Sequence, residues 1–114
     1  MLAARRLRCT LASMLLSSLV RTEDTVARYG GEEFVVVARG TRIDGAAQLA
    51  ERVRVVVERT RTAVGEQMVP VTVSAGAASL ACLGGEQTVL NLLSLADARL
   101  YQAKEQGRNR VVAR

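Results

Sequence analysis

The sequence contains no histidine and no tryptophan, and it has only two cysteines, one proline, two tyrosines and one phenylalanine. Without histidine, a Ser-His or Cys-His nucleophile pair and a histidine-rich zinc site are excluded. Cys9 and Cys82 are isolated and lack CxxC spacing, which argues against a cysteine metal site and favours a reducing cytoplasm as the location. Because aromatic residues are scarce, we expect a hydrophobic core built from leucine, valine and alanine.

What the chain does have is apolar content and positive charge. Of its 114 residues 49% are apolar, without internal repeat or low-complexity tract, so we expect one globular domain over residues 1–114. The net charge of +5 favours anionic partners such as nucleotides, nucleic acid or membrane surfaces. Lys104 is the single lysine among sixteen cationic side chains.

The first twenty residues allow two interpretations. Arg5, Arg6 and Arg8 precede a mostly apolar run at residues 9–20, as in a secretory signal peptide. The run is too short to span a bilayer, and a convincing small-x-small cleavage site is missing. The alternative is an amphipathic helix whose apolar stripe consists of Leu7, Leu11, Met14, Leu15 and Leu19. We favour the helix, and we expect no membrane insertion by this chain.

Residues 28–34 read RYGGEEF and are followed by three valines. A Gly-Gly pair between β-favouring residues predicts a two-residue hairpin turn, because both turn positions need a positive φ that glycine adopts without strain. Successive strand residues point to opposite faces, so Glu32 and Glu33 cannot have the same role. One can face a ligand or metal at the hairpin tip; the alternative is a plain hairpin with two solvated glutamates.

A long helix is predicted after this hairpin. Thr41 and Asp44 have the spacing of a capping box at its start. From Ala46 to Val57 apolar residues recur at helical spacing, with arginine and glutamate outside the stripe. Residues 60–67 then predict a polar connection.

The last third of the chain predicts a strand, a helix and a short terminal strand. Residues 69–74 are β-favouring, and their proline lies at the start, where a strand tolerates it. Thr88 can cap the helix, which ends at the C-cap glycine Gly107, and residues 108–112 return as a strand. This order of elements predicts an α/β or α+β domain with a mixed sheet flanked by helices.

Four segments, in order, resemble the GGDEF domains, the diguanylate cyclases of bacterial signalling, in their GGEEF form. The segments are residues 28–34 (RYGGEEF), 49–54 (LAERVR), 71–76 (VTVSAG) and 96–111 (ADARLYQAKEQGRNRV). The resemblance runs from about residue 11 to residue 112, which is nearly the whole chain. GGEEF alone is a short motif, but four ordered blocks at family-like spacing are specific.

The resemblance implies a cyclase-like sheet that condenses two GTP molecules into cyclic di-GMP with release of two pyrophosphates. Each subunit of a symmetric homodimer would present one GTP, and each 3′-hydroxyl would attack the α-phosphate held opposite. The implied cofactor is Mg²⁺ or Mn²⁺, which bridges phosphates and neutralises developing charge. Carboxylates are the natural ligands of such cations.

By resemblance, the hairpin carries the catalytic residues. Glu32 is the implied metal ligand, and Glu33 is a second catalytic candidate. Gly30 and Gly31 would keep side chains away from the bound GTP.

Lys104 and Arg108 would hold the terminal phosphates of GTP, again by resemblance. Lys104 lies in the predicted final helical turn and Arg108 just past its glycine cap, so both can converge on one anion. The alternative is that the two cations merely complement the helix dipole. We prefer phosphate binding because the family segments surround both residues.

Arg21 and Asp24 form an RxxD motif five residues before Gly30, an arrangement that is similar to the inhibitory cyclic di-GMP site of many of these cyclases. Arginine can contact a phosphate or a guanine edge in bidentate fashion, and aspartate can accept from guanine N–H groups. By resemblance, Arg52 matches the arginine that supports this inhibitory site in the family. The alternative is a salt bridge at a helix end.

The chain departs from the family at its N-terminal side. A complete domain opens with a strand bearing a metal-binding aspartate, an FK pair, and Asn-Asp and Gly-His-x-x-Gly-Asp segments that recognise guanine. None of these occurs here, and about Arg6 takes the place of the guanine-reading aspartate. We therefore expect an N-terminally truncated domain without the family's first strand and helix. Such a chain should be a weak or inactive cyclase, and the strands beside the lost one should expose unpaired edges and favour self-association.

Two other functions stay open. One is a catalytically inactive cyclic di-GMP receptor that uses Arg21, Asp24 and Arg52. The other is a basic interaction module. The second is weaker, and we expect no nucleic-acid partner, because the arginines are scattered and no stacking aromatic residues accompany them.

Overall fold

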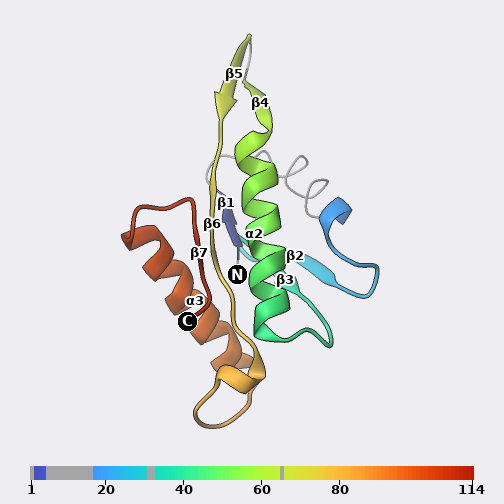
Figure 1. Ribbon diagram of the computed structural model, residues 1–114, viewed down its shortest axis with the longest axis vertical. Coiled ribbons are helices and arrows are strands. Elements are labelled where there is room, and N and C mark those ends of the chain that lie inside the picture. The colour runs from blue at the N-terminus through green and yellow to red at the C-terminus, as the bar shows by residue number, and fades with distance from the viewer. Residues whose placement is uncertain (1, 5–16, 31–32, 65) are drawn as a thin grey trace.

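The computed structural model describes residues 2–4, 17–30, 33–64 and 66–114. Its main sheet has five strands in the order β2-β3-β1-β6-β7, with α2 and α3 packed against it (Figure 1). The elements of this layer are β1 (Leu2–Ala4), β2 (Thr25–Arg28), β3 (Glu33–Val37), α2 (Ile43–Arg59), β6 (Val73–Gly76), α3 (Val89–Glu105) and β7 (Val111–Val112). β7 is parallel to β6 whereas the other pairs are antiparallel, so the predicted mixed sheet flanked by helices is confirmed.

β1 lies between β3 and β6 and pairs with both. Leu2 is opposite Phe34 on β3, and Ala3 is opposite Ser74 on β6. The prediction that these two strands would expose unpaired edges was therefore wrong. A ladder is made by backbone groups whatever the side chains are, so three residues without the family's aspartate can still occupy this position. Most of the predicted first helix lies outside the described residues; residues 17–19 are helical.

The β2–β3 hairpin is present, but its turn differs from the prediction. Arg28 pairs with Phe34, and the Tyr29 N–H donates to the Glu33 carbonyl over 2.8 Å, which leaves three residues, 30–32, to close the hairpin. The prediction of a two-residue turn with two positive φ angles was therefore wrong. Gly30 does not adopt a positive φ, and Gly31 lies outside the described residues.

The helix predicted after the hairpin is α2, and its apolar stripe faces the core through Ala50, Val53 and Val57. The prediction of a capping box was wrong, because the N-cap residue is Arg42 and no side chain makes a capping hydrogen bond to the helix. The Thr41 hydroxyl is engaged elsewhere, by the Arg21 guanidinium over 2.7 Å.

The stretch predicted as a polar connection is a two-stranded ribbon instead. β4 (Arg61–Val64) pairs with β5 (Gln67–Pro70), and the ribbon projects beyond the end of α2 (Figure 1). The predicted strand at residues 69–74 is accordingly split, because β6 begins only at Val73. Gln67 and Met68, which open β5, are both exposed, so they lack the alternation of buried and exposed side chains by which a half-buried strand is recognised.

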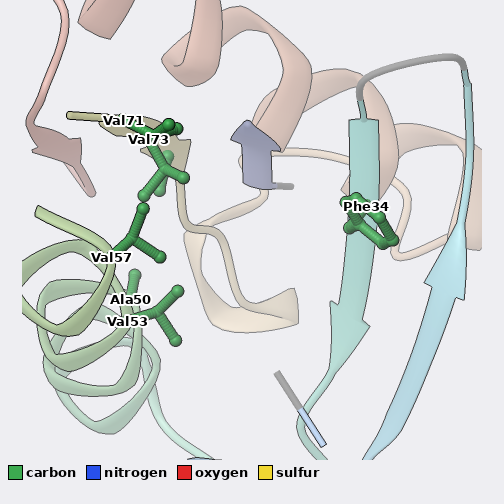
Figure 2. Packing of buried hydrophobic residues seen from close by; sticks show 7 residues of the cluster. Phe34, Ala50, Val53, Val57, Val71 and Val73 are labelled. Atoms are coloured by element: carbon green, nitrogen blue, oxygen red, sulfur yellow. The ribbon is translucent and has the colours of Figure 1, made fainter. Parts of the chain in front are cut away.

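One part of the core lies between α2 and the sheet, and α3 buries Ala96, Leu100 and Ala103 as well. Figure 2 shows Val57 of α2 pointing toward Val71 and Val73, with Phe34 on β3. The buried cluster consists of Phe34, Ala50, Val53, Val57, Val71, Val73 and Ala75. Apart from Phe34, it is the aliphatic core that the composition predicts.

α3 is capped at both ends as predicted. Thr88 accepts a hydrogen bond from the Asn91 N–H over 3.1 Å. At the other end Gly107 has φ +117°, and the Arg108 N–H donates to the Ala103 carbonyl over 2.9 Å, which is a Schellman motif. A short 3₁₀ helix, η1 (Leu80–Cys82), precedes α3. Of the helices in the described residues, none has the length and apolarity to cross a membrane.

Candidate functional site

The hairpin tip and the end of α3 meet through one ion pair. Glu33 is the first residue of β3, and its carbonyl accepts from the N–H groups of Tyr29 and Gly30, which fixes its position. Its Oε1 lies 3.9 Å from Lys104 Nζ, and each side chain is about one-third exposed (34% and 32%). Folding therefore places the single lysine of the chain beside a GGEEF carboxylate. Glu32 lies outside the described residues.

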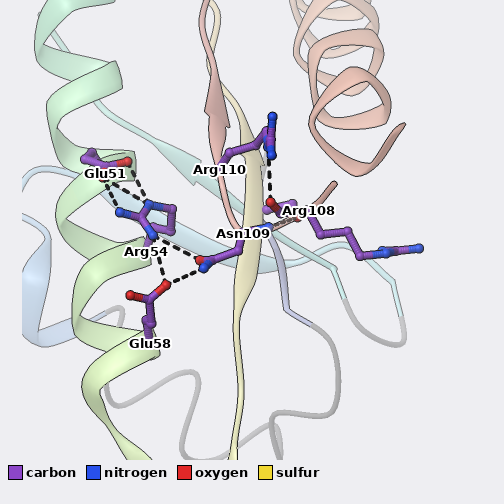
Figure 3. A network of polar contacts seen from close by, with 7 residues as sticks. Glu51, Arg54, Glu58, Arg108, Asn109 and Arg110 are labelled. Atoms are coloured by element: carbon purple, nitrogen blue, oxygen red, sulfur yellow. Dashed lines mark hydrogen bonds and ion pairs between the residues drawn. The ribbon is translucent and has the colours of Figure 1, made fainter. Parts of the chain in front are cut away.

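Arg108 lies on the turn directly after α3, four residues beyond Lys104. It is exposed and has a left-handed backbone with φ 64°. Figure 3 shows its side chain extending away from Arg54 and Asn109. Lys104 and Arg108 thus flank the Schellman turn, where helix carbonyl groups end and cations are favoured. Their predicted roles in phosphate binding stay predictions.

The three residues of the predicted inhibitory site line one pocket. Arg21 and Asp24 precede β2, Arg52 projects from α2, and the pocket between them has a volume of about 230 Å³. The remaining lining residues are Leu19, Ala38, Thr41, Gly45, Gln48 and Leu49. The fold therefore brings together a motif and an arginine that lie far apart in the sequence.

Arg21 and Asp24 are held by each other and by the loop between β3 and α2. The Asp24 side chain is 1% exposed and accepts from the Arg21 backbone N–H over 3.1 Å and from the Arg21 guanidinium over 3.4 Å. Burial acts to raise the pKa of Asp24, but these hydrogen bonds and the Arg21 charge outweigh it and hold the pKa below its ordinary value. The carboxylate is thus ionised and oriented.

Thr41 belongs to this pocket, although the sequence pattern assigned it to helix capping. Its hydroxyl accepts from Arg21 Nη2 over 2.7 Å, and the same nitrogen donates to the Arg39 carbonyl over 2.9 Å. Gln48 is a second lining residue that the sequence did not indicate. No local pattern could have found either residue, because both lie twenty or more positions from Arg21 in the sequence and meet it only in the folded chain.

A further polar network, also missed from the sequence, joins α2 to the turn after α3 (Figure 3). Arg54 pairs with Glu51 and Glu58 on its own helix, and its Nη1 donates to Asn109 Oδ1 over 3.0 Å. The hydrogen bonds from Arg54 lower the pKa of Glu51, and the two glutamates raise the pKa of Arg54. Arg54 and Glu51 therefore hold each other in their charged forms.

The described residues do not by themselves form a metal site. A group of three or more acidic, cysteine or histidine side chains close enough to share an ion is absent from this part of the chain. Glu33 is near the hairpin tip, but its carboxylate faces Lys104. The geometry of the described residues therefore assigns no metal-dependent step.

The described residues form a mixed α/β domain, and comparison with known proteins identifies its family. The profile of the family described as diguanylate cyclase, GGDEF domain, matches residues 9–110. The response regulator PleD of Caulobacter vibrioides is 42% identical over 104 residues, which cover 90% of this chain and 22% of PleD.

Two solved structures are also similar. The active GGEEF domain of a diguanylate cyclase from Vibrio cholerae superimposes with a TM-score of 0.80 at 28% identity, covering 90% of this chain and 64% of that one. The GGDEF domain of DgcB from Caulobacter crescentus, solved in complex with c-di-GMP, has a TM-score of 0.79 at 30% identity, covering 89% and 57%. The chain belongs to the GGDEF family. It spans about a quarter of the length of the curated relatives that it matches.

Proposed function

We propose that this chain is the nucleotide-binding part of a diguanylate cyclase, which condenses two GTP molecules into cyclic di-GMP with release of two pyrophosphates. The observation that carries the proposal is the approach of Lys104 Nζ to Glu33 within 3.9 Å, at the GGEEF hairpin. A partly exposed ion pair is worth little, so an incoming phosphate can take the ammonium group from the carboxylate. Lys104 and Arg108 would then hold the terminal phosphates, and Gly30 and Gly31 would leave room for the nucleotide.

The two glutamates of the hairpin have different proposed roles. Glu33, released from Lys104, is the second catalytic candidate beside the 3′-hydroxyl of GTP. Glu32 is proposed to hold Mg²⁺ or Mn²⁺, which would supply charge neutralisation on the phosphates when bound. The condensation needs two GTP molecules, so we propose that the active form is a homodimer. We propose the cytoplasm as its location.

GTP binding tests this proposal directly. Calorimetric titration of the 114-residue chain with GTP and Mg²⁺ should show binding, and Lys104→Ala and Arg108→Ala should each weaken it about tenfold, as expected for losing one charge-assisted contact. Arg59→Ala is the matched control, because Arg59 is an exposed cation near the end of α2, away from these roles. Absence of GTP binding, or equal losses in all three variants, would refute the phosphate site.

Turnover is a separate measurement. We expect pyrophosphate release from GTP to be weak or absent, because the guanine-reading segments of the family are missing from this sequence. Rapid release by the purified chain would show that those segments are not required.

The pocket of Arg21, Asp24 and Arg52 favours a second activity, the binding of cyclic di-GMP. Its volume of about 230 Å³ lies below the roughly 300–1,000 Å³ of drug-sized ligand sites. We therefore propose that it takes one guanine and the adjacent phosphate. The ionised Asp24 would accept from guanine N–H groups, while Arg21 and Arg52 would contact phosphate or a guanine edge.

A titration with cyclic di-GMP tests the pocket. Arg21→Ala should weaken binding by tenfold or more, as expected for loss of a charge-assisted contact, whereas Arg59→Ala should leave it unchanged. Unaltered affinity in Arg21→Ala would place the ligand elsewhere. Binding of cyclic di-GMP without any binding of GTP would favour a catalytically inactive receptor over a cyclase.

A further inference from the structure

The turn that carries Arg108 has an unusual backbone. Gly107, Arg108 and Asn109 have φ angles of +117°, +64° and +48° in succession. Glycine and asparagine visit this region readily, but for arginine the Cβ makes it costly. A residue held in such a conformation needs surroundings that over-determine it, and such positions concentrate at functional sites.

Asn109 connects this turn to the sheet and to α2. Its backbone N–H donates to Ser74 Oγ over 3.1 Å, and Ser74 is buried within β6. Its side-chain oxygen accepts from Arg54 Nη1 over 3.0 Å, while its Nδ2 donates to the Glu58 carboxylate (Figure 3). The turn is thus attached to the sheet by its backbone and to α2 by its side chain.

Arg54 is itself rigidly placed. Its guanidinium contacts both carboxylate oxygens of Glu51, at 2.5 to 3.0 Å, and Glu58 at 3.2 Å, and its side chain is only 17% exposed. A planar guanidinium paired on two edges has little freedom to rotate. Arg54 therefore presents one fixed N–H group to Asn109.

We propose that Arg54 is a positioning residue for Arg108 and that it acts through Asn109. The proposal rests on the proposed function, in which Arg108 binds the terminal phosphates of GTP. Bidentate recognition of a phosphate depends on the direction of the guanidinium, and displacing a positioned group by about 1 Å can abolish much of its effect. Without Arg54, the Asn109 side chain keeps only its contact with Glu58, whose carboxylate Arg54 no longer holds in place. The side-chain attachment of the turn to α2 is then weaker, and Arg108 samples other directions.

A double-mutant cycle separates this role from a general loss of stability. Inorganic pyrophosphate with Mg²⁺ is titrated calorimetrically into the unsubstituted 114-residue chain, Arg54→Met, Arg108→Ala and the double variant. Arg54→Met keeps the length and apolar stem of the side chain but removes its donors. We expect each single variant to bind about tenfold more weakly, and the double variant no more weakly than Arg108→Ala alone. Arg59→Met, with the same charge change on the same helix, should bind normally.

Asn109→Gly provides a second variant in case Arg54→Met does not fold. Glycine accepts the left-handed backbone at position 109 without strain but lacks the amide that contacts Arg54 and Glu58. It should weaken pyrophosphate binding as much as Arg54→Met, in a chain whose far-ultraviolet circular dichroism is unchanged. If the losses of binding free energy of the two single variants add in the double variant, the positioning role of Arg54 is overturned. Unchanged affinity in both Arg54→Met and Asn109→Gly would overturn it too, and in either case the phosphate site itself would stand. Failure of the unsubstituted chain to bind pyrophosphate would overturn the proposed phosphate site and this inference with it.

Discussion

Replacing Gly76 by alanine should separate α3 from the sheet. A Cβ at this position would lie 2.1 Å from the Ala96 carbonyl oxygen and 2.3 Å from the Leu100 nitrogen. Both atoms belong to the backbone of α3, so no side chain can rotate out of the way. Real Cβ atoms essentially never approach other atoms within 3.0 Å, so the helix must retreat by about 1 Å.

The cost follows from what α3 buries. Ala96, Leu100 and Ala103 are 7%, 2% and 0% exposed against the sheet. A radial gap of about 1 Å removes a substantial part of their dispersion contacts. Together with the strain of overpacking, about 1–3 kcal/mol, we expect a loss of about 3 kcal/mol in the free energy of unfolding. In urea this corresponds to a midpoint lower by about 2 M, for a slope of about 1.5 kcal/mol per molar.

The assay is urea unfolding followed by circular dichroism, with Gly84→Ala as the control. A Cβ at Gly84 meets no atom within 4 Å, and the φ of Gly84 is not positive. The free energy of unfolding of Gly84→Ala should therefore match that of the unsubstituted chain within about 0.5 kcal/mol. Equal midpoints for the Gly76→Ala and Gly84→Ala variants would refute the close approach of α3 to β6.

Three further predictions concern the same fold and its pocket. The pKa of Asp24 is held below its ordinary value of 3.8, so its carboxylate stabilises the fold above that pH and this contribution is lost as the pH falls through the lowered pKa. Urea midpoints between about pH 2 and pH 7 should therefore change less with pH in Asp24→Asn, and an identical profile would contradict this. Thr88→Ala should cost about 1 kcal/mol by removing the N-cap of α3, Thr88→Ser should restore most of it, and thermal unfolding would distinguish them. Leu100→Ala should cost about 2–5 kcal/mol in the same urea assay, because Leu100 is 2% exposed, and a loss below about 1 kcal/mol would contradict its place in the core.

The helices and the hairpin were predictable because their signals are local. The 3.6-residue spacing of apolar side chains identified α2, and Thr88 and Gly107 identified the ends of α3. The β2–β3 hairpin was likewise expected, although its register, which pairs Arg28 with Phe34, made the turn one residue longer. Element type depends on neighbours within a few residues, whereas register depends on the whole sheet.

The candidate sites were predictable only as sets of separate residues. The sequence indicated Arg21, Asp24 and Arg52 by resemblance, but not that Thr41 holds the Arg21 guanidinium in the same pocket. Thr41 has the spacing of a capping residue, and its hydroxyl was taken by a partner twenty residues away. When a side chain has two possible hydrogen-bond partners, the packing around it decides which partner it takes.

The sequence by itself determined the family, the two long helices and the aliphatic core, because each depends on composition or on local spacing. Only the tertiary structure decided that residues 2–4 fill the gap between β3 and β6, since backbone pairing does not depend on side-chain identity. It also decided that Lys104 meets Glu33 and that Arg54 meets Asn109. These contacts join residues far apart in the chain, and they exist only once α2 and α3 are packed on one sheet.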